Sequence, residues 1–143
     1  MKKVTLKLVL PLTIILFFCV TKWWCVAVDA PNTPLSGFPF PYTGKAWGSS
    51  MSFQYFLFEF LVDLAVYFAI VFAVTYLVYS YIIPQQPHRV IFFSLYIVAT
   101  LFVTMGILTI SATDSFFYLY REFEIKTINT EYLFIGQVPP DCF

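Results

Sequence analysis

Residues 64–83 read LAVYFAIVFAVTYLVYSYII, and residues 90–112 read VIFFSLYIVATLFVTMGILTISA. Neither stretch contains an Asp, Glu, Lys or Arg residue. About 20 consecutive apolar residues are enough for a helix to cross the hydrocarbon core of a bilayer, which is about 30 Å thick. These two stretches therefore decide the fold, and they predict an integral membrane protein.

The composition of the whole chain supports the same prediction. Of its 143 residues, 60% are hydrophobic, 22% are aromatic and only 11% are charged, and the formal net charge is zero. Soluble domains carry about 25% charged residues, and disordered chains combine low hydrophobicity with high charge. The chain also lacks the basic excess typical of proteins that bind nucleic acid. We therefore expect the lipid bilayer as the main partner, and no nucleic acid.

A third apolar run, near the N-terminus, completes a predicted all-α integral membrane fold with three transmembrane helices in a single domain. The predicted segments are spans over residues 4–28, 53–83 and 90–112, an outer loop over 29–52, an inner loop over 84–89 and an outer tail over 113–143. Because the inner loop is short, we expect the second and third spans to be adjacent and antiparallel.

The first apolar run has two interpretations. Its basic start, its apolar stretch and the small residues around Val28 and Ala30 resemble a cleavable secretory signal. Trp23 and Trp24 beside Lys22 are instead typical of the interfacial aromatic belt of a membrane anchor. We expect the segment to be retained as a span.

The charged residues divide unequally between the two sides of these spans. One side carries four basic residues and no acidic residue: Lys2, Lys3, Lys7 and Arg89. The outer loop and the outer tail together hold three basic and six acidic residues. Because basic residues mark the cytoplasmic side, we predict a multi-pass protein of the inner (cytoplasmic) membrane, with the N-terminus inside and the C-terminus outside. Three spans give the odd number that this orientation requires.

Glu59 and Asp63, near the start of the second span, form a candidate acidic pair. The two residues are four apart, so they share one face of a helix. Carboxylates inside a membrane often belong to proton or cation pathways. The length of the span favours a different interpretation, in which the pair lies in the headgroup zone, solvated or paired with Lys22 or Lys45.

The outer loop contains the sequence PNTPLSGFPFPYTGKAWGSS at residues 31–50. Its Pro and Gly content is typical of a linker, but exposing its aromatic side chains to water would be costly. We therefore predict an ordered loop whose aromatic residues contact lipid or a neighbouring protein. These candidate contact residues are Phe38, Phe40, Tyr42 and Trp47.

In the outer tail, residues 123–128 (FEIKTI) and 131–135 (EYLFI) are rich in β-branched and aromatic residues. This pattern predicts a short C-terminal β-hairpin that turns at Asn129-Thr130. The alternative is that the third helix continues to about Tyr120.

Two of the three cysteines, Cys25 and Cys142, fall on the predicted outer side. Disulfides form in such compartments, so these two residues are a candidate disulfide pair. Cys19 lies within the first predicted span and is expected to be buried as an apolar side chain.

Three hydroxyl residues, Thr100, Thr104 and Ser111, lie on one side of the third span. Small and hydroxyl residues allow membrane helices to approach closely and to form hydrogen bonds between helices. We predict a helix-packing face, first against another span of this chain and second against a partner subunit.

The sequence has no phosphate loop, nucleophile elbow or zinc-binding motif. The single histidine, His88, is expected to be an exposed residue of the inner loop. We therefore predict no catalytic, cofactor-binding or metal-binding residue, no cofactor, and a protein that is not an enzyme.

The segment Gly37-Phe38-Pro39-Phe40-Pro41-Tyr42, followed by a polar stretch and a long aromatic span, resembles a loose pattern in small uncharacterised bacterial inner-membrane proteins. The resemblance covers about residues 37–75. It implies a bacterial inner-membrane protein and no particular activity.

Three functional hypotheses follow. The first is an accessory or structural, non-catalytic subunit of a larger inner-membrane complex, because three helices hardly enclose a path for a solute. The second is a small self-associating transporter or ion pathway that uses Glu59 and Asp63. The third is a lipid-binding or lipid-modifying protein whose outer loop meets the headgroups.

Overall fold

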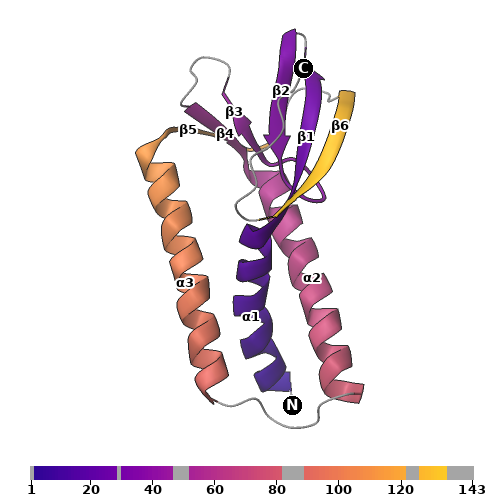
Figure 1. The fold of residues 1–143 in the computed structure, drawn as a ribbon, viewed down its shortest axis with the longest axis vertical. Helices are drawn as coiled ribbons and strands as arrows, with labels where there is room; N and C mark the ends of the chain where they lie inside the picture. The colour runs from indigo at the N-terminus through magenta and orange to yellow at the C-terminus, as the bar shows by residue number, and fades with distance from the viewer. Residues whose placement is uncertain (1, 29, 47–51, 82–88, 122–125, 135–143) are drawn as a thin grey trace.

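The computed structural model describes residues 2–28, 30–46, 52–81, 89–121 and 126–134. The elements in chain order are α1 (Lys2–Cys19), β1 (Val20–Val28), β2 (Ala30–Ser36), β3 (Thr43–Lys45), β4 (Ser52–Phe56), α2 (Leu57–Tyr81), α3 (Arg89–Ala112), β5 (Asp114–Tyr118) and β6 (Lys126–Phe134). The three helices run side by side, and the strands gather at one end of them (Figure 1). The start of α1, the end of α2 and the start of α3 lie at the opposite end.

The prediction of an all-α fold with three transmembrane helices is wrong. The described residues form three helices and a six-stranded mixed sheet, so the fold combines α and β structure. Within them, two stretches are long and apolar enough to cross a membrane, Leu57–Val78 and Arg89–Ala112. The apolar part of α1 is shorter, covering Lys7–Cys19.

The first predicted span, over residues 4–28, is divided at Cys19. The following residues, Val20–Val28, form β1, whose sequence VTKWWCVAV is rich in β-branched and aromatic residues. Such residues favour strands, and β1 is paired along both of its edges. The apolar run is therefore longer than the helix, because its second part, Val20–Val28, is buried in the sheet.

The second predicted span also begins as a strand. In β4, Ser52, Gln54 and Phe56 are buried and alternate with more exposed residues, and the helix begins only at Leu57. The third predicted span differs little from the structure, since α3 covers Arg89–Ala112. At about 1.5 Å per residue, its 24 residues extend over about 36 Å.

The sheet has the strand order β5-β4-β3-β2-β1-β6. All neighbouring strands are antiparallel except β4 and β5, which are parallel. Leu35 of β2 is fully buried and packs with Val26 and Trp24 of β1. A Cβ atom at Gly44, its neighbour on β3, would lie 2.2 Å from the Leu35 side chain, so any larger residue at this position would displace the buried leucine.

The predicted C-terminal hairpin is wrong, and so is its alternative. Strand β6 continues from Lys126 through Asn129-Thr130 to Phe134 as the antiparallel partner of β1. Helix α3 ends at Ala112, and β5 begins two residues later. The free edge of β1 supplies hydrogen-bonding partners along the whole of β6, which a two-stranded hairpin would lack.

Helix α1 lies between α2 and α3 and packs against both, so the adjacent hairpin expected for α2 and α3 is not formed (Figure 1). The Phe18 ring stacks on Phe102 of α3 at 5.8 Å between centroids. The Phe17 ring meets Phe60 and Tyr67 of α2 edge-on, at 5.2 and 5.5 Å. Aromatic contacts therefore hold α1 in the middle position.

The cysteines allow a direct chemical test of this fold. Cys25 of β1 is disulfide-bonded, whereas Cys19 at the end of α1 has a free thiol. The predicted pairing of Cys25 with Cys142 stays a prediction, because Cys142 lies outside the described residues.

Alkylation of the unfolded protein without reductant should label Cys19 and spare Cys25, and reduction should expose Cys25. Peptide mass spectrometry reads both sites, and labelling of Cys25 before reduction would contradict the fold.

Candidate functional site

Asp63 joins α2 to the loop between β2 and β3. Its side chain is fully buried, and its Oδ1 atom accepts a hydrogen bond of 3.0 Å from the backbone N–H of Phe40. A buried carboxylate needs such a donor, because burying the carboxylate and the amide without a hydrogen bond between them would cost free energy. Asp63 is thus neither solvated nor paired with Lys22 or Lys45 in the described contacts, and it anchors a loop.

Glu59 lies one turn earlier in α2 and contacts a different segment. Its Oε1 atom accepts a hydrogen bond of 3.4 Å from the backbone N–H of Arg121, just after β5. The N–H of Phe58 donates to the carbonyl of Leu119 at 3.0 Å, beside this contact. The acidic pair thus shares a helix face, and each carboxylate accepts a backbone N–H from a segment beside the sheet, Asp63 from Phe40 and Glu59 from Arg121.

The loop between β2 and β3, residues 37–42, is ordered, and its aromatic residues separate into different roles. Tyr42 stacks on Phe17 at 5.4 Å and meets Phe60 edge-on at 5.4 Å. Phe38 packs against Tyr67 of α2 at 6.1 Å between ring centroids. Phe40, in contrast, is 49% exposed.

Trp47, the fourth candidate contact residue, lies outside the described residues.

Burial, together with the nearby Asp63 carboxylate, raises the pKa of the Tyr42 hydroxyl above its ordinary value, so this hydroxyl stays protonated. Tyr42 therefore meets α1 and α2 as a neutral aromatic residue with a hydroxyl that can donate a hydrogen bond.

A cavity of about 610 Å³ lies where the helices meet the sheet, and we call it the junction cavity. Its helical wall includes Phe18, Phe60, Leu64, Val103, Gly106 and Ile110. Toward the sheet it is lined by three residues with hydroxyl groups, Tyr42, Thr43 and Tyr55. Burial also raises the pKa of the Tyr55 hydroxyl, which forms a hydrogen bond with the Thr43 side chain.

The junction cavity follows from the position of α1 between the other two helices. Helix α1 packs against both α2 and α3, and residues of all three helices and of strands β3 to β5 line the cavity. Gly106 adds no side chain to this space, and a Cβ atom there would approach the Phe18 ring to 3.1 Å. Ligand pockets have volumes of about 300–1,000 Å³ with mostly apolar walls and few polar groups. The junction cavity fits this description.

The predicted packing face of α3 is exposed in the structure. The hydroxyls of Thr100, Thr104 and Ser111 are exposed, and each donates to the carbonyl four residues earlier in the same helix. Contact with α1 is made instead on the side of α3 that carries Ala99 and Phe102. The hydroxyl face stays a prediction for contact with a partner subunit.

The acidic residues and Tyr42 were identified from the sequence, but the junction cavity was not. Its single sequence signal is Gly106, a residue without a side chain among the bulky residues of α3. Among the residues that the structure describes, no three His, Cys, Asp or Glu side chains come together to hold a metal ion. The site is therefore defined by shape and apolar lining.

The chain matches no known protein family, no curated protein and no solved structure. The loop pattern Gly37–Tyr42 thus stays a resemblance.

Replacing the anchor residue Asp63 tests its role. We expect Asp63→Ala to lower the free energy of unfolding by about 2 kcal/mol, because the amide of Phe40 loses its acceptor in a buried site. Asp63→Asn keeps an oxygen acceptor and should lower the free energy of unfolding less than Asp63→Ala does. Glu59→Gln, at a longer hydrogen bond, is the matched control with a small effect. Thermal unfolding in detergent measures all three, and a wild-type midpoint for Asp63→Ala would contradict the anchoring role.

Proposed function

We propose that this protein is a membrane protein that binds a lipid in the junction cavity. The observation that carries the proposal is the cavity itself, with apolar walls from α1, α2 and α3 and hydroxyl groups toward the sheet. An acyl chain would lie against the apolar walls, and the polar end of the lipid would face Tyr42, Thr43 and Tyr55. Binding rather than chemistry is proposed because this lining offers apolar contacts and hydroxyl groups.

The surfaces of α2 and α3 support insertion into a membrane. Large apolar side chains are exposed along both helices, such as Ile70 at 51% and Leu101 at 60%. Exposing so much contiguous apolar surface to water is unfavourable, and a bilayer removes the cost. With both helices in the bilayer, the junction cavity would open to the acyl chains near one surface of the membrane.

The orientation proposed for the protein follows from its basic residues. Lys7 and Arg89 belong to the end of the helices that is opposite to the sheet. Basic residues near a span favour the cytoplasmic side, so this end would face the cytoplasm. The sheet would then lie outside the inner membrane, where the disulfide of Cys25 is stable.

Filling the junction cavity tests the proposal. Val103→Trp should occupy the cavity, while Met105→Trp adds the same side chain at an outward-facing position that is 63% exposed. We expect the wild type and Met105→Trp to retain one phosphatidylcholine molecule after transfer from nanodiscs to detergent, and Val103→Trp to retain none. Native mass spectrometry counts the bound lipids. Equal retention in all three proteins would contradict the proposal.

A second function, an accessory subunit of a larger membrane complex, is favoured by the edges of the sheet. In the described part of the chain, β5 and β6 are the terminal strands. Ile128 and Asn129 of β6 are exposed, as is Phe117 of β5. Strands at the edge of a sheet present backbone groups to which another chain can pair. The exposed hydroxyl face of α3 offers a further contact within the membrane.

Sizing in mild detergent tests this second function. Light scattering is expected to give a protein mass well above the 16.6 kDa of one chain, with a second protein or a further copy in a fixed ratio. The lipid-binding proposal makes no such demand. A protein mass of one chain, with nothing co-purifying, would exclude the subunit function and leave lipid binding unaffected.

A further inference from the structure

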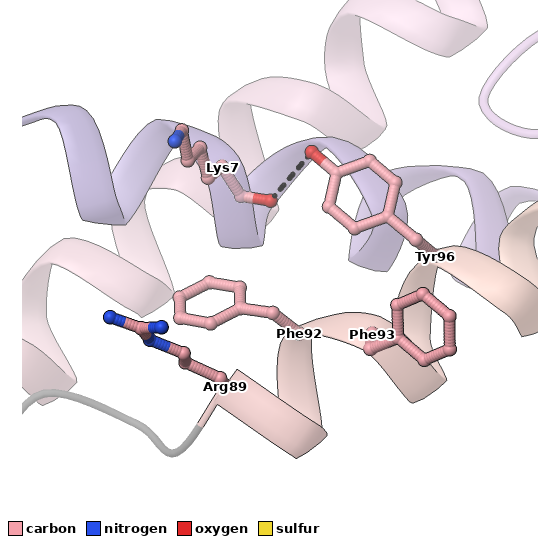
Figure 2. Close-up of a pocket in the computed structure, with 5 residues that line it drawn as sticks. All are labelled: Lys7, Arg89, Phe92, Phe93 and Tyr96. Carbon is pink, nitrogen blue, oxygen red and sulfur yellow. Dashed lines mark hydrogen bonds between the residues drawn. The ribbon is translucent and has the colours of Figure 1, made fainter.

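A second cavity, of about 550 Å³, lies at the end of the helices that is opposite to the sheet. We call it the cationic pocket. It is lined by Lys7 of α1 and by Arg89, Phe92, Phe93 and Tyr96 of α3, and Figure 2 shows how these residues lie along the two helices. The junction cavity has hydroxyl groups as its polar lining, whereas this pocket has two cations.

The cationic pocket has a defined shape because α1 and α3 are tied together beside it. The Tyr96 hydroxyl donates a hydrogen bond of 3.1 Å to the backbone carbonyl of Lys7 (Figure 2). Phe92 is partly buried, while Phe93 is 72% exposed. The pocket thus combines aromatic walls with two exposed basic side chains, those of Lys7 and Arg89.

No carboxylate of the three helices competes for these two cations. The sequence has no Asp or Glu in residues 1–28 or 64–113, which include all of α1, all of α3 and α2 from Leu64 onward. The acidic residues of α2, Glu59 and Asp63, lie in its first two turns, next to the sheet. The pocket is therefore complementary to an anion with an apolar part.

We infer that the cationic pocket binds the headgroup phosphate of an anionic phospholipid from the membrane leaflet at this end. The planar guanidinium of Arg89 matches two phosphate oxygens. The Lys7 ammonium can reach the same headgroup layer while its stem covers apolar surface. Phe92 and Phe93 supply apolar contacts for the upper part of the acyl chains. The inference rests on the proposed membrane insertion of α2 and α3, and it is independent of lipid in the junction cavity.

Competition between two lipids tests the inference. Protein from nanodiscs that contain equal amounts of phosphatidylglycerol and phosphatidylcholine is released into detergent, and native mass spectrometry measures the ratio of the retained lipids. We expect wild type to prefer phosphatidylglycerol. Arg89→Gln should reduce this preference about fivefold, and Lys7→Gln with Arg89→Gln about 25-fold, because each cation near an anionic surface contributes a factor of about five.

Matched variants separate this site from other causes. Lys45→Gln removes one charge near the sheet and should keep the wild-type preference for phosphatidylglycerol. Arg89→Lys keeps the charge but loses the planar guanidinium, so its preference should lie between those of wild type and Arg89→Gln. Val103→Trp should change phosphatidylcholine retention without weakening the preference for phosphatidylglycerol. This variant makes failure of the junction cavity distinguishable from failure of the cationic pocket.

Two results would overturn the inference. One is an unchanged lipid preference in Arg89→Gln and in the double variant. The other is loss of phosphatidylglycerol on addition of inorganic phosphate at constant ionic strength, which would mean that the pocket takes a free phosphate ion. Retention of the lipid under that challenge is the expected result, because the acyl chains add apolar contacts.

Discussion

The pairing of β1 on both of its edges is the constraint on which the rest of the structure depends. Strand β1 follows α1 without an intervening residue, and it is held by β2 on one side and β6 on the other. Its direction therefore fixes where α1 leaves the sheet, in the space between α2 and α3. From that position, α1 contributes to both the junction cavity and the cationic pocket.

The two cavities give the helical part of the molecule different chemistry at its two ends. In the junction cavity, the lining residues from the sheet side carry neutral hydroxyl groups, and nearby Asp63 accepts a hydrogen bond from the backbone N–H of Phe40. At the other end, Lys7 and Arg89 are free of carboxylate neighbours from the helices. Such a division would suit a membrane whose two leaflets differ in charge, with the more anionic leaflet facing the cytoplasm.

The two charge-free runs predicted α3 closely and most of α2, because length and lack of charge are properties of the chain itself. The boundary at Cys19 was missed, since an apolar aromatic run is the same whether a bilayer or a sheet buries it. The strand signal of Val20–Val28 was present, but its partner β6 lies about 100 residues later, beyond any local pattern. The role of Asp63 was missed for a similar reason, because its partner is a backbone amide that any residue could supply.

The parallel pairing of β4 with β5 has a mechanical consequence. Strand β4 leads directly into α2, and β5 follows α3 after Thr113, so the ladder from Ser52–Asp114 to Phe56–Tyr118 ties the two helices at the sheet. Spreading the helices there would break backbone hydrogen bonds, and at the opposite end the chain runs from Tyr81 of α2 to Arg89 of α3 through only seven residues. The two helices are therefore restrained at both ends, by hydrogen bonds at the sheet and by the continuous chain at the opposite end, and α1 lies between partners whose separation is limited.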